Sequence, residues 1–298
     1  MAEKKGFRVL ISGATGQLGS DCTDLLSSGH TVFPFSSAQL DISSRDTVDD
    51  TVKETSPDII VNCGAYTAVD LCETEQERAM GVNANGPAYL AAAASRHNAR
   101  LIHISTDYVF DGRKAVPAPY LEDDAVGPLS IYGKSKLAGE RGVQENCADS
   151  LILRTAWLYG HRGKNFLKTM LRLTLADRRR EIRVVNDQYG SLTWTHSLAR
   201  QVEQLLDSRL CGIAHATAEG YCTWFEGACY FLDRMEVPHN LAPCTTADYP
   251  TPAPRPNNSI LENGLLKREG LMVMQDWKKD IDVFVGRYRD TLLQEAQS

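Results

Sequence analysis

A tyrosine and a lysine spaced four residues apart, Tyr132 and Lys136, are the pair in this sequence best suited to proton transfer. On a helix, side chains at i and i+4 lie on one face, with Cβ atoms about 6 Å apart. A lysine ammonium group stabilises the phenolate and lowers a tyrosine pKa from about 10 toward neutrality. It can also bind the ribose hydroxyls of a nicotinamide. The spacing therefore predicts a general acid or base, although it also occurs on ordinary surface helices.

A hydroxyl-rich tetrapeptide, Ser105-Thr106-Asp107-Tyr108, follows a strand expected over residues 101–105. Ligands of open α/β sheets gather at the carboxyl ends of the strands. A hydroxyl at this point can bind a substrate carbonyl oxygen and adjust the tyrosine. We interpret Thr106 in this way, with a simple Ser-Thr-Asp turn as the alternative.

Three glycines, Gly13, Gly16 and Gly19, stand between the first expected strand and the first expected helix in G-x-x-G-x-x-G spacing. Glycine permits a tight turn and a close backbone approach to a pyrophosphate, and the helix N-terminus adds unpaired N–H groups. The sequence therefore predicts a dinucleotide loop, to which Thr15, Gln17 and Leu18 also belong.

The choice of dinucleotide depends on the end of the second expected strand, residues 31–35, where Ser36 and Ser37 follow. An acid at this position binds the ribose 2′-hydroxyl of NADH and repels a 2′-phosphate. Because no acid is present, NADPH is favoured, and NADH stays possible. Asp41 and Ile42 follow in a loop and can contact adenine, although Asp41 can equally serve as a helix cap or a solvent-exposed acid.

Strand-like and helical segments alternate through the first half of the chain. Strands are expected over 7–12, 31–35, 59–62, 101–105 and 151–155, and helices over 17–26, 45–54, 72–97 and 130–145. This alternation predicts an α/β fold with a doubly wound, Rossmann-type parallel sheet. We expect residues 1–156 to form the dinucleotide-binding domain, with return segments near 191–218. Residues 157–298, with a proline-rich stretch over 248–258, are expected to form a smaller mixed α/β region for the substrate.

Composition excludes several classes of protein. The net charge of −6 leaves no basic surplus for nucleic acid. No apolar run approaches the about 20 residues of a membrane span. Eight scattered cysteines without a Cys-x-x-Cys motif predict reduced thiols and no metal site. We therefore expect a cytoplasmic protein that binds neither nucleic acid nor membrane.

Several longer stretches resemble the extended short-chain dehydrogenase/reductase family, and within it the reductases of dTDP-linked 4-keto deoxysugars. The resemblance covers nearly the whole chain. It is carried by GATGQLG (13–19), PDIIVNCGAYTAVDLCE (57–73), STDYVFDG (105–112), YGKSKLAGE (132–140), LRTAWLYG (153–160), NF (165–166), VVNDQYG (184–190) and YPTPAPRPNNSIL (249–261).

The resemblance implies NADPH-dependent reduction of the sugar C4 keto group, with Tyr132 as proton donor, Lys136 as its electrostatic partner and Thr106 as a hydrogen-bond partner of the oxygen. Further cofactor-binding residues implied are Gly64, Ala65, Thr67 and Ser105. Substrate-binding residues implied are Asp107, Trp157, Asn165, Phe166, Gln188 and Arg255. A forked guanidinium suits a diphosphate, although Arg255 can also be a surface residue of a proline-rich turn.

Some features stay open at the level of sequence. The enzyme can act on another nucleotide-linked sugar, or the chain can be a regulatory subunit that binds dinucleotide without turnover. Some relatives dimerise through a magnesium site built from glutamates, and here Asp21 and His196 stand in that region. We therefore expect no metal among the site residues, leave magnesium open, and expect a monomer or a homodimer.

Overall fold

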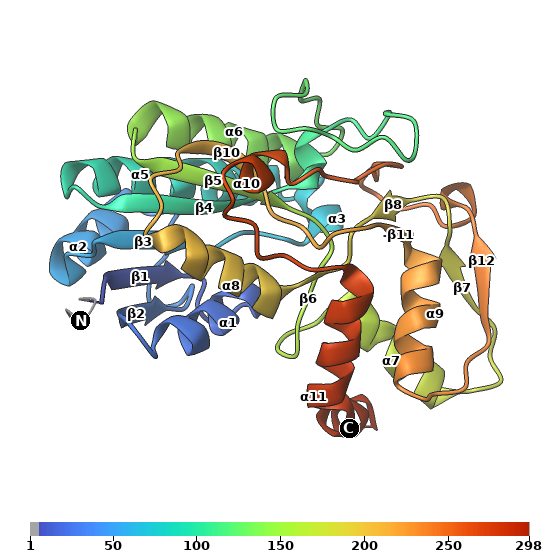
Figure 1. Ribbon diagram of the computed structural model, residues 1–298. Coiled ribbons are helices and arrows are strands. Elements are labelled where there is room, and N and C mark those ends of the chain that lie inside the picture. The colour runs from blue at the N-terminus through green and yellow to red at the C-terminus, as the bar shows by residue number, and fades with distance from the viewer. Residues whose placement is uncertain (1–5, 298) are drawn as a thin grey trace.

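A six-stranded parallel sheet forms the centre of the computed structural model, which describes residues 6–297 (Figure 1). Its strands are β1 (Arg8–Ser12), β2 (Thr31–Phe35), β3 (Ile59–Asn62), β4 (Arg100–Thr106), β5 (Ser150–Thr155) and β10 (Gly212–His215). Their order is β10-β5-β4-β3-β1-β2. In this order β2 lies on one side of β1, and β3 lies on the other side. The predicted doubly wound fold is confirmed, and the order reverses between β1 and β3, where such sheets bind ligands.

Helices cover both faces of this sheet because its inner strands are buried on both faces. One face packs against α1 (Gln17–Leu26), α8 (Thr195–Leu206) and the short α10 (Gly264–Arg268). The other packs against α2 (Arg45–Thr55), α5 (Gly86–Arg96) and α6 (Ile131–Asn146). Late segments of the chain, α8 and β10, thus complete a sheet begun at the N-terminus.

The helical stretch expected over 72–97 is confirmed for residues 76–96, which run without a gap through α4 (Gln76–Met80), a π-helical turn (Gly81–Asn85) and α5. Its expected start is wrong, because α3 (Val69–Cys72) ends at Cys72 and residues 73–75 are not helical. The π turn directs Asn83 inward, where its Nδ2 donates to the Tyr66 carbonyl at 3.0 Å and to Ser135 Oγ at 3.1 Å. Such turns inside helices often mark functional positions. Here the turn ties the segment after β3 to α6, which carries the tyrosine and lysine.

The C-terminal part has an apolar core of its own, built around Trp194, Phe231 and Phe284. It contains α7 (Phe166–Ala176), α9 (Trp224–Arg234) and α11 (Trp277–Gln297), which lie together at the lower right of Figure 1. Its strand pairs are β7 (Ile182–Val185) with β12 (Leu241–Cys244), β8 (Tyr189–Gly190) with β11 (Cys222–Thr223), and β6 (Leu158–Tyr159) with β9 (Thr193–Trp194). Short 3₁₀ turns occupy Asp107–Val109 and Thr246–Asp248.

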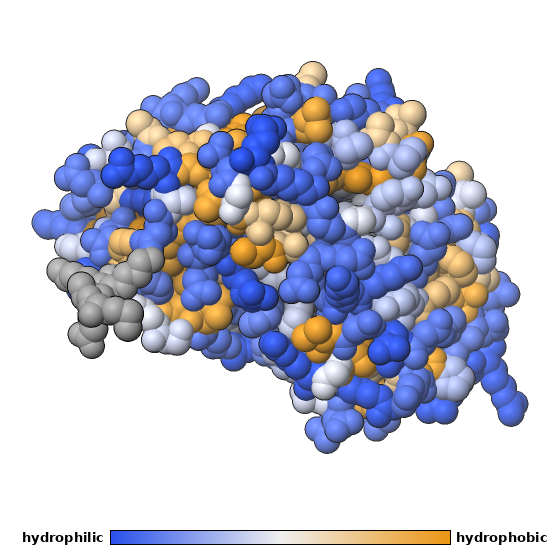
Figure 2. Space-filling model, viewed as in Figure 1, coloured by the Kyte–Doolittle hydropathy of each residue, from blue (hydrophilic) through white to orange (hydrophobic). Residues whose placement is uncertain are grey.

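The surface is mixed in character. In the view of Figure 2, hydrophilic residues cover most of the face, and hydrophobic residues appear as small separate groups. No helix within residues 6–297 is long and apolar enough to cross a membrane.

Candidate active site

The glycine-rich loop has the shape of a cradle at the carboxyl end of β1. Gly13 has φ +69°, and a Cβ on Gly19 would lie 2.2 Å from the Gly13 carbonyl oxygen. Gly16 is the N-cap of α1 and provides no side chain for the first N–H groups of the helix. A close-packed turn with free N–H groups at a helix N-terminus fits the pyrophosphate of a dinucleotide. The residues present therefore fit a nicotinamide dinucleotide.

The floor of this crevice is a buried polar network. Ser12 Oγ donates to Asn62 Oδ1 at 2.7 Å, and the Gly64 N–H donates to the same oxygen at 3.0 Å. Asn62 Nδ2 lies 3.0 Å from His103 Nδ1. Burial lowers the pKa of His103 well below its ordinary value, so this imidazole is neutral. Sequence reasoning missed Asn62 and His103, because lone polar residues inside apolar strands form no motif.

The other predicted cofactor residues lie around this crevice with different exposure. Ile42 is buried, and its Cδ1 would meet a Cβ on Gly64 at 3.1 Å, so it lines the wall beside β3. Asp41 is exposed, and its Oδ1 accepts hydrogen bonds from the Ser43 N–H at 3.0 Å and hydroxyl at 2.6 Å. That carboxylate thus closes a local turn. Leu18 is buried, Gln17 and Ala65 are half-buried, and Thr15 and Thr67 are exposed.

Thr106 and Tyr132 meet at the carboxyl end of β4. Tyr132 is in the first turn of α6 and is 9% exposed, and its ring packs edge-on against Tyr108 at a centroid distance of 5.3 Å. Burial and the nearby Asp107 carboxylate raise the pKa of Tyr132 above its ordinary value, and a hydrogen bond with Thr106 acts against them. The lowered tyrosine pKa expected from the sequence is therefore wrong. Tyr132 is held as a neutral phenol, the form that donates a proton.

Lys136 lies one turn further along α6 and is 2% exposed. Its Nζ donates to the Ile104 carbonyl oxygen at 2.7 Å. Burial lowers the pKa of Lys136 to about 8, and the Glu140 carboxylate acts to raise it. The ammonium form therefore predominates only below about pH 8.

Asp107 lies next to both reactive hydroxyls. Thr106 Oγ1 donates to Asp107 Oδ1 at 2.8 Å, and the buried Ser259 hydroxyl also acts on this carboxylate. Burial raises the pKa of Asp107 to about 6. A buried carboxylate beside the tyrosine can accept a hydrogen bond from a substrate hydroxyl, because each of its oxygens has two lone pairs.

A cavity of about 990 Å³ opens between the sheet and the C-terminal part. Three predicted substrate residues line it, Phe166, Gln188 and Arg255. Its wall also contains β7, α7 and the exposed Tyr249. The size and the mixture of apolar wall and basic groups suit a sugar nucleotide.

Arg255 is held at the mouth of this cavity by two partners. Its NH2 donates to Asp70 Oδ2 at 2.8 Å, and its NH1 donates to the Tyr108 hydroxyl at 3.2 Å. Asp70 also accepts from the Ala253 N–H at 3.2 Å, so one carboxylate fixes both the guanidinium and its backbone. Asp70 lies inside the 57–73 stretch that carries the resemblance, but sequence reasoning gave it no role.

Trp157, with φ +49°, does not line this cavity but packs behind Trp224 of its wall. Its ring stacks on Trp224 at a centroid distance of 3.6 Å, and a Cβ on Gly190 would lie 2.6 Å from the Trp157 ring. Trp224 Nε1 donates to Gln188 Oε1 at 3.2 Å, which joins two predicted residues through one that was not predicted. Trp224 starts α9, a helix outside every motif that we recognised.

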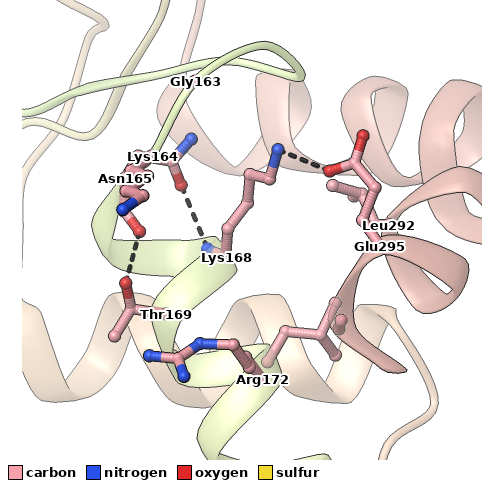
Figure 3. Close-up of a pocket in the computed structure, with 10 residues that line it drawn as sticks. Gly163, Lys164, Asn165, Lys168, Thr169, Arg172, Leu292 and Glu295 are labelled. Atoms are coloured by element: carbon pink, nitrogen blue, oxygen red, sulfur yellow. Dashed lines mark hydrogen bonds and ion pairs between the residues drawn. The ribbon is translucent and has the colours of Figure 1, made fainter. Parts of the chain in front are cut away.

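Asn165 has a structural role and does not line the large cavity. It caps α7 through Oδ1, which accepts from the Lys168 N–H at 3.0 Å (Figure 3). Its Nδ2 donates to Gln17 Oε1 at 3.0 Å and to the Gly160 carbonyl at 2.8 Å. Asn165 therefore joins the dinucleotide loop to the helix that begins with Phe166.

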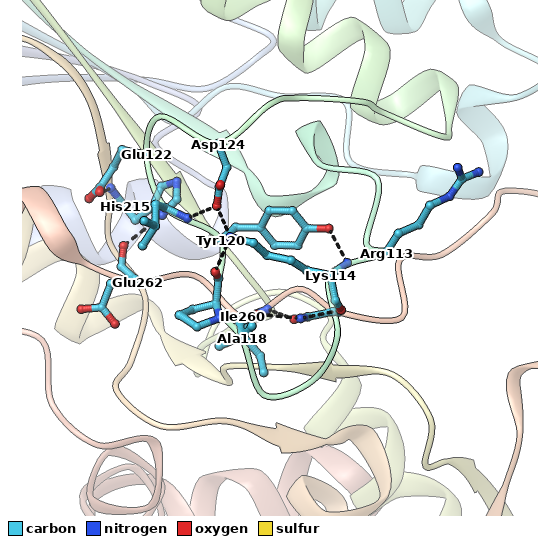
Figure 4. A network of polar contacts seen from close by, with 12 residues as sticks. Arg113, Lys114, Ala118, Tyr120, Glu122, Asp124, His215, Ile260 and Glu262 are labelled. Atoms are coloured by element: carbon cyan, nitrogen blue, oxygen red, sulfur yellow. Dashed lines mark hydrogen bonds and ion pairs between the residues drawn. The ribbon is translucent and has the colours of Figure 1, made fainter.

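The loop over residues 111–128 is tied to the segment that carries Arg255 (Figure 4). The Tyr120 N–H donates to the Ile260 carbonyl at 2.8 Å, and Asn258 Nδ2 donates to the Ala118 carbonyl at 2.9 Å. His215, at the end of β10, has its Nδ1 3.0 Å from the Glu262 carbonyl oxygen. The proline-rich segment is therefore held by the sheet although it has no regular structure itself.

No group of three or more possible metal ligands is present in the part of the chain that the structure describes. Asp21 is engaged by the Thr195 hydroxyl. His196 has its Nε2 3.3 Å from Arg287 NH1.

A family model, curated proteins and solved structures all show similarity to this chain over most of its length. The family described as RmlD substrate binding domain matches residues 7–290. The spore coat polysaccharide biosynthesis protein SpsK of Bacillus subtilis is 40% identical over 265 residues, which cover 89% of this chain and 92% of that protein. The dTDP-4-dehydrorhamnose reductase of Escherichia coli is 39% identical over 287 residues, 91% of this chain and 95% of that protein. The crystal structure of dTDP-4-dehydrorhamnose reductase from Bacillus anthracis in complex with NADP has a TM-score of 0.91 and 38% identity, and covers 95% of this chain and 99% of that one.

Proposed function

The chain belongs to the RmlD substrate binding domain family, and we propose that it reduces dTDP-4-dehydro-β-L-rhamnose to dTDP-β-L-rhamnose with NADPH. The observation that carries this proposal is the grouping of Thr106, Tyr132 and Lys136 beside the glycine cradle. The hydroxyls follow β4 and the glycine loop follows β1, at the same carboxyl edge of the sheet with β3 between them. The full-length similarity to reductases of this substrate supports the same reaction.

Tyr132 is the proton donor in this proposal. A bound NADPH supplies the hydride to C4 of the keto sugar, and the carbonyl oxygen gains negative charge as that bond forms. The Tyr132 hydroxyl gives its proton to this oxygen, while the Thr106 hydroxyl would turn from Asp107 Oδ1 to donate a hydrogen bond to it. The raised pKa of Tyr132 keeps the proton in place until that charge develops.

Lys136 stabilises the phenolate that remains after transfer and binds the ribose hydroxyls. Both roles need the ammonium form. Since burial lowers the pKa of Lys136 to about 8, we expect kcat/KM to fall as the pH rises through about 8.

Substrate binding divides between the two parts of the chain. We propose that the sheet part, residues 1–156 with the return near 191–218, binds the cofactor, and that residues 157–298 bind most of the sugar nucleotide. Arg255 would exchange Asp70 for the diphosphate, because a guanidinium binds phosphate oxygens in a bidentate manner. Asp107 and Trp157 would contact the sugar.

NADPH is the preferred cofactor in this proposal. No acid follows β2 at Ser36 and Ser37, so nothing there repels a 2′-phosphate. The similar reductase of Bacillus anthracis was crystallised with NADP. A cytoplasmic location is part of the same proposal, because all eight cysteines are free, as is usual in a reducing compartment.

The experiment is a spectrophotometric assay of NADPH and NADH oxidation with dTDP-, UDP- and CDP-linked 4-keto sugars. We expect turnover with NADPH and the dTDP-linked sugar. Tyr132→Phe should lower kcat by about 10²- to 10⁴-fold, the usual contribution of general acid catalysis, and should still bind NADPH. Folded protein that oxidises neither cofactor contradicts the reaction. Full activity in Tyr132→Phe contradicts the role of the tyrosine.

A further inference from the structure

A fully buried ion pair adjoins the proposed catalytic groups, because Glu140 shares α6 with Tyr132 and Lys136 and accepts from Ser105 on β4. Glu140 and Arg154 are 1% and 2% exposed. Arg154 Nε donates to Glu140 Oε1 at 2.9 Å, and its NH2 donates to Oε2 at 2.7 Å. Burying two charges costs about as much as their attraction returns, so such a pair is weak support for stability. Its position therefore suggests a role in the site.

The Glu140 carboxylate also holds the end of β4. Ser105 Oγ donates to Glu140 Oε1 at 2.6 Å. The neighbours of Ser105 in β4 are Ile104, whose carbonyl accepts from Lys136, and Thr106. Glu140 Oε1 thus holds Ser105, which lies between Ile104, the acceptor for Lys136, and Thr106.

Glu140 also lies one helical turn beyond Lys136 on the same face of α6. The charged and titratable groups that act around Lys136 are Glu140 on its own helix, His103 on β4 and Cys63 after β3. Tyr132 lies one turn before it. The imidazole of His103 is neutral, so Glu140 is the permanent charge in this set that favours the ammonium form. Arg154 behind it offsets part of that charge.

We propose that Glu140 is a positioning residue that orients Ser105 and holds Lys136 as an ammonium ion beneath the nicotinamide ribose, with Arg154 setting how much of its charge Lys136 experiences. The proposal rests on the cofactor role given to Lys136 above. It predicts that removing the charge of Glu140 lowers the pH at which Lys136 titrates, and that removing the charge of Arg154 raises it.

The test measures NADPH affinity against pH by the fluorescence of bound NADPH, without sugar substrate. Affinity should fall on the alkaline side with a midpoint set by Lys136. Glu140→Gln keeps the shape but removes the carboxylate, so the midpoint should move down by about one pH unit or more. Arg154→Met removes the charge that opposes the Glu140 carboxylate, so the midpoint should move up.

The pair Glu236 and Arg289 at the surface of the C-terminal part, joined at 2.9 Å, provides the control. Glu236→Gln and Arg289→Met should not move the midpoint.

Glu140→Gln leaves Arg154 buried without its partner and can fail to fold. The double variant Glu140→Gln/Arg154→Met leaves no unpaired buried charge, and its midpoint should lie below that of the unaltered protein. If the ion pair had only a structural role, its substitutions would weaken NADPH binding equally at every pH. An unchanged midpoint in the folded variants therefore overturns the proposal. Absence of sugar reduction would overturn the proposed reaction, but the cofactor titration would still decide the role of Glu140.

Discussion

Replacement of Asp280 by asparagine should stabilise the protein at neutral pH. Asp280 lies in the first turn of α11 and is 2% exposed. Ser197 Oγ on α8 donates to its Oδ1 at 2.7 Å, whereas Oδ2 is buried without a hydrogen-bond partner within residues 6–297. Burial raises the pKa of Asp280 from 3.8 to about 6. The carboxylate therefore joins the C-terminal helix to the sheet layer at a cost in its ionised form.

The size of this cost follows from the shift. A rise of about 2.2 pKa units, from 3.8 to about 6, corresponds to about 3 kcal/mol at 1.36 kcal/mol per unit. Because the folded pKa is raised, the carboxyl contributes stability below about pH 3.8 that is lost as the pH rises through about 6. The penalty is about 1.6 kcal/mol at pH 5 and about 3 kcal/mol at pH 7.5. Asparagine has no such penalty, but its hydrogen bond to Ser197 is weaker, which subtracts about 1 kcal/mol from the gain in stability.

The assay is urea unfolding followed by circular dichroism at about pH 7.5 and pH 5. We expect Asp280→Asn to gain about 2 kcal/mol at the higher pH and clearly less at the lower one. Asp290→Asn is the control, because Asp290 is on the same helix with its side chain 90% exposed. It should change stability little and equally at both pH values. A loss of stability at pH 7.5, or a gain that does not depend on pH, would refute the reasoning.

Two further predictions concern ligand binding. Gly19→Ala places a Cβ 2.2 Å from the Gly13 carbonyl, so NADPH binding measured by fluorescence should be lost, whereas Gly29→Ala, with nothing within 4 Å, should bind normally. Normal binding by Gly19→Ala would show that the loop does not hold the dinucleotide. Arg255→Ala should weaken dTDP binding by about 10- to 100-fold in calorimetry, the usual value of a lost charge-assisted hydrogen bond. Arg209→Ala, beside Asp58 at the other edge of the sheet, should have no effect, and equal loss in both variants would exclude a specific contact.

The parallel sheet and the dinucleotide loop could be predicted because their signals are local. The strand bounds 31–35 and 59–62 and the helix bounds 17–26 agree with the structure, since apolar runs and glycine turns encode these elements over a few residues. The π-helical turn within the 76–96 helix could not be predicted. Its Asn83 contacts Tyr66 and Ser135, residues that are distant in sequence.

Two helices of the C-terminal part, α9 and α11, were missed although each has a signal in the sequence. The helix α9 begins with a capping box formed by Thr223 and Glu226, a signal present in the sequence that we did not use. The helix α11 has buried apolar residues at helical spacing, a signal that is also present in the sequence: Trp277, Ile281, Phe284, Val285 and Leu292.

The direction of the Tyr132 pKa shows a further limit of motif reasoning. The spacing of Tyr132 and Lys136 correctly suggests that they share a helix face. It does not reveal that both are buried, or that Asp107 lies beside the phenol. Burial acts on both groups against their charged forms. The tyrosine is therefore held neutral, and the lysine needs a carboxylate to remain an ammonium ion near neutral pH.

The proposed catalytic groups and the proposed substrate-binding groups are held in place by different means. Thr106 and Tyr132 come from the end of β4 and the first turn of α6, both parts of the sheet layers. Arg255 comes from a proline-rich segment placed by contacts with other loops. Gly112, at φ +68°, passes so close that a Cβ there would lie 2.4 Å from Pro256 Cβ. A change in these loops would move Arg255 directly, whereas it would reach Tyr132 only through Tyr108. The reaction type is therefore encoded in short motifs, whereas the choice of sugar nucleotide depends on tertiary contacts that motifs do not contain.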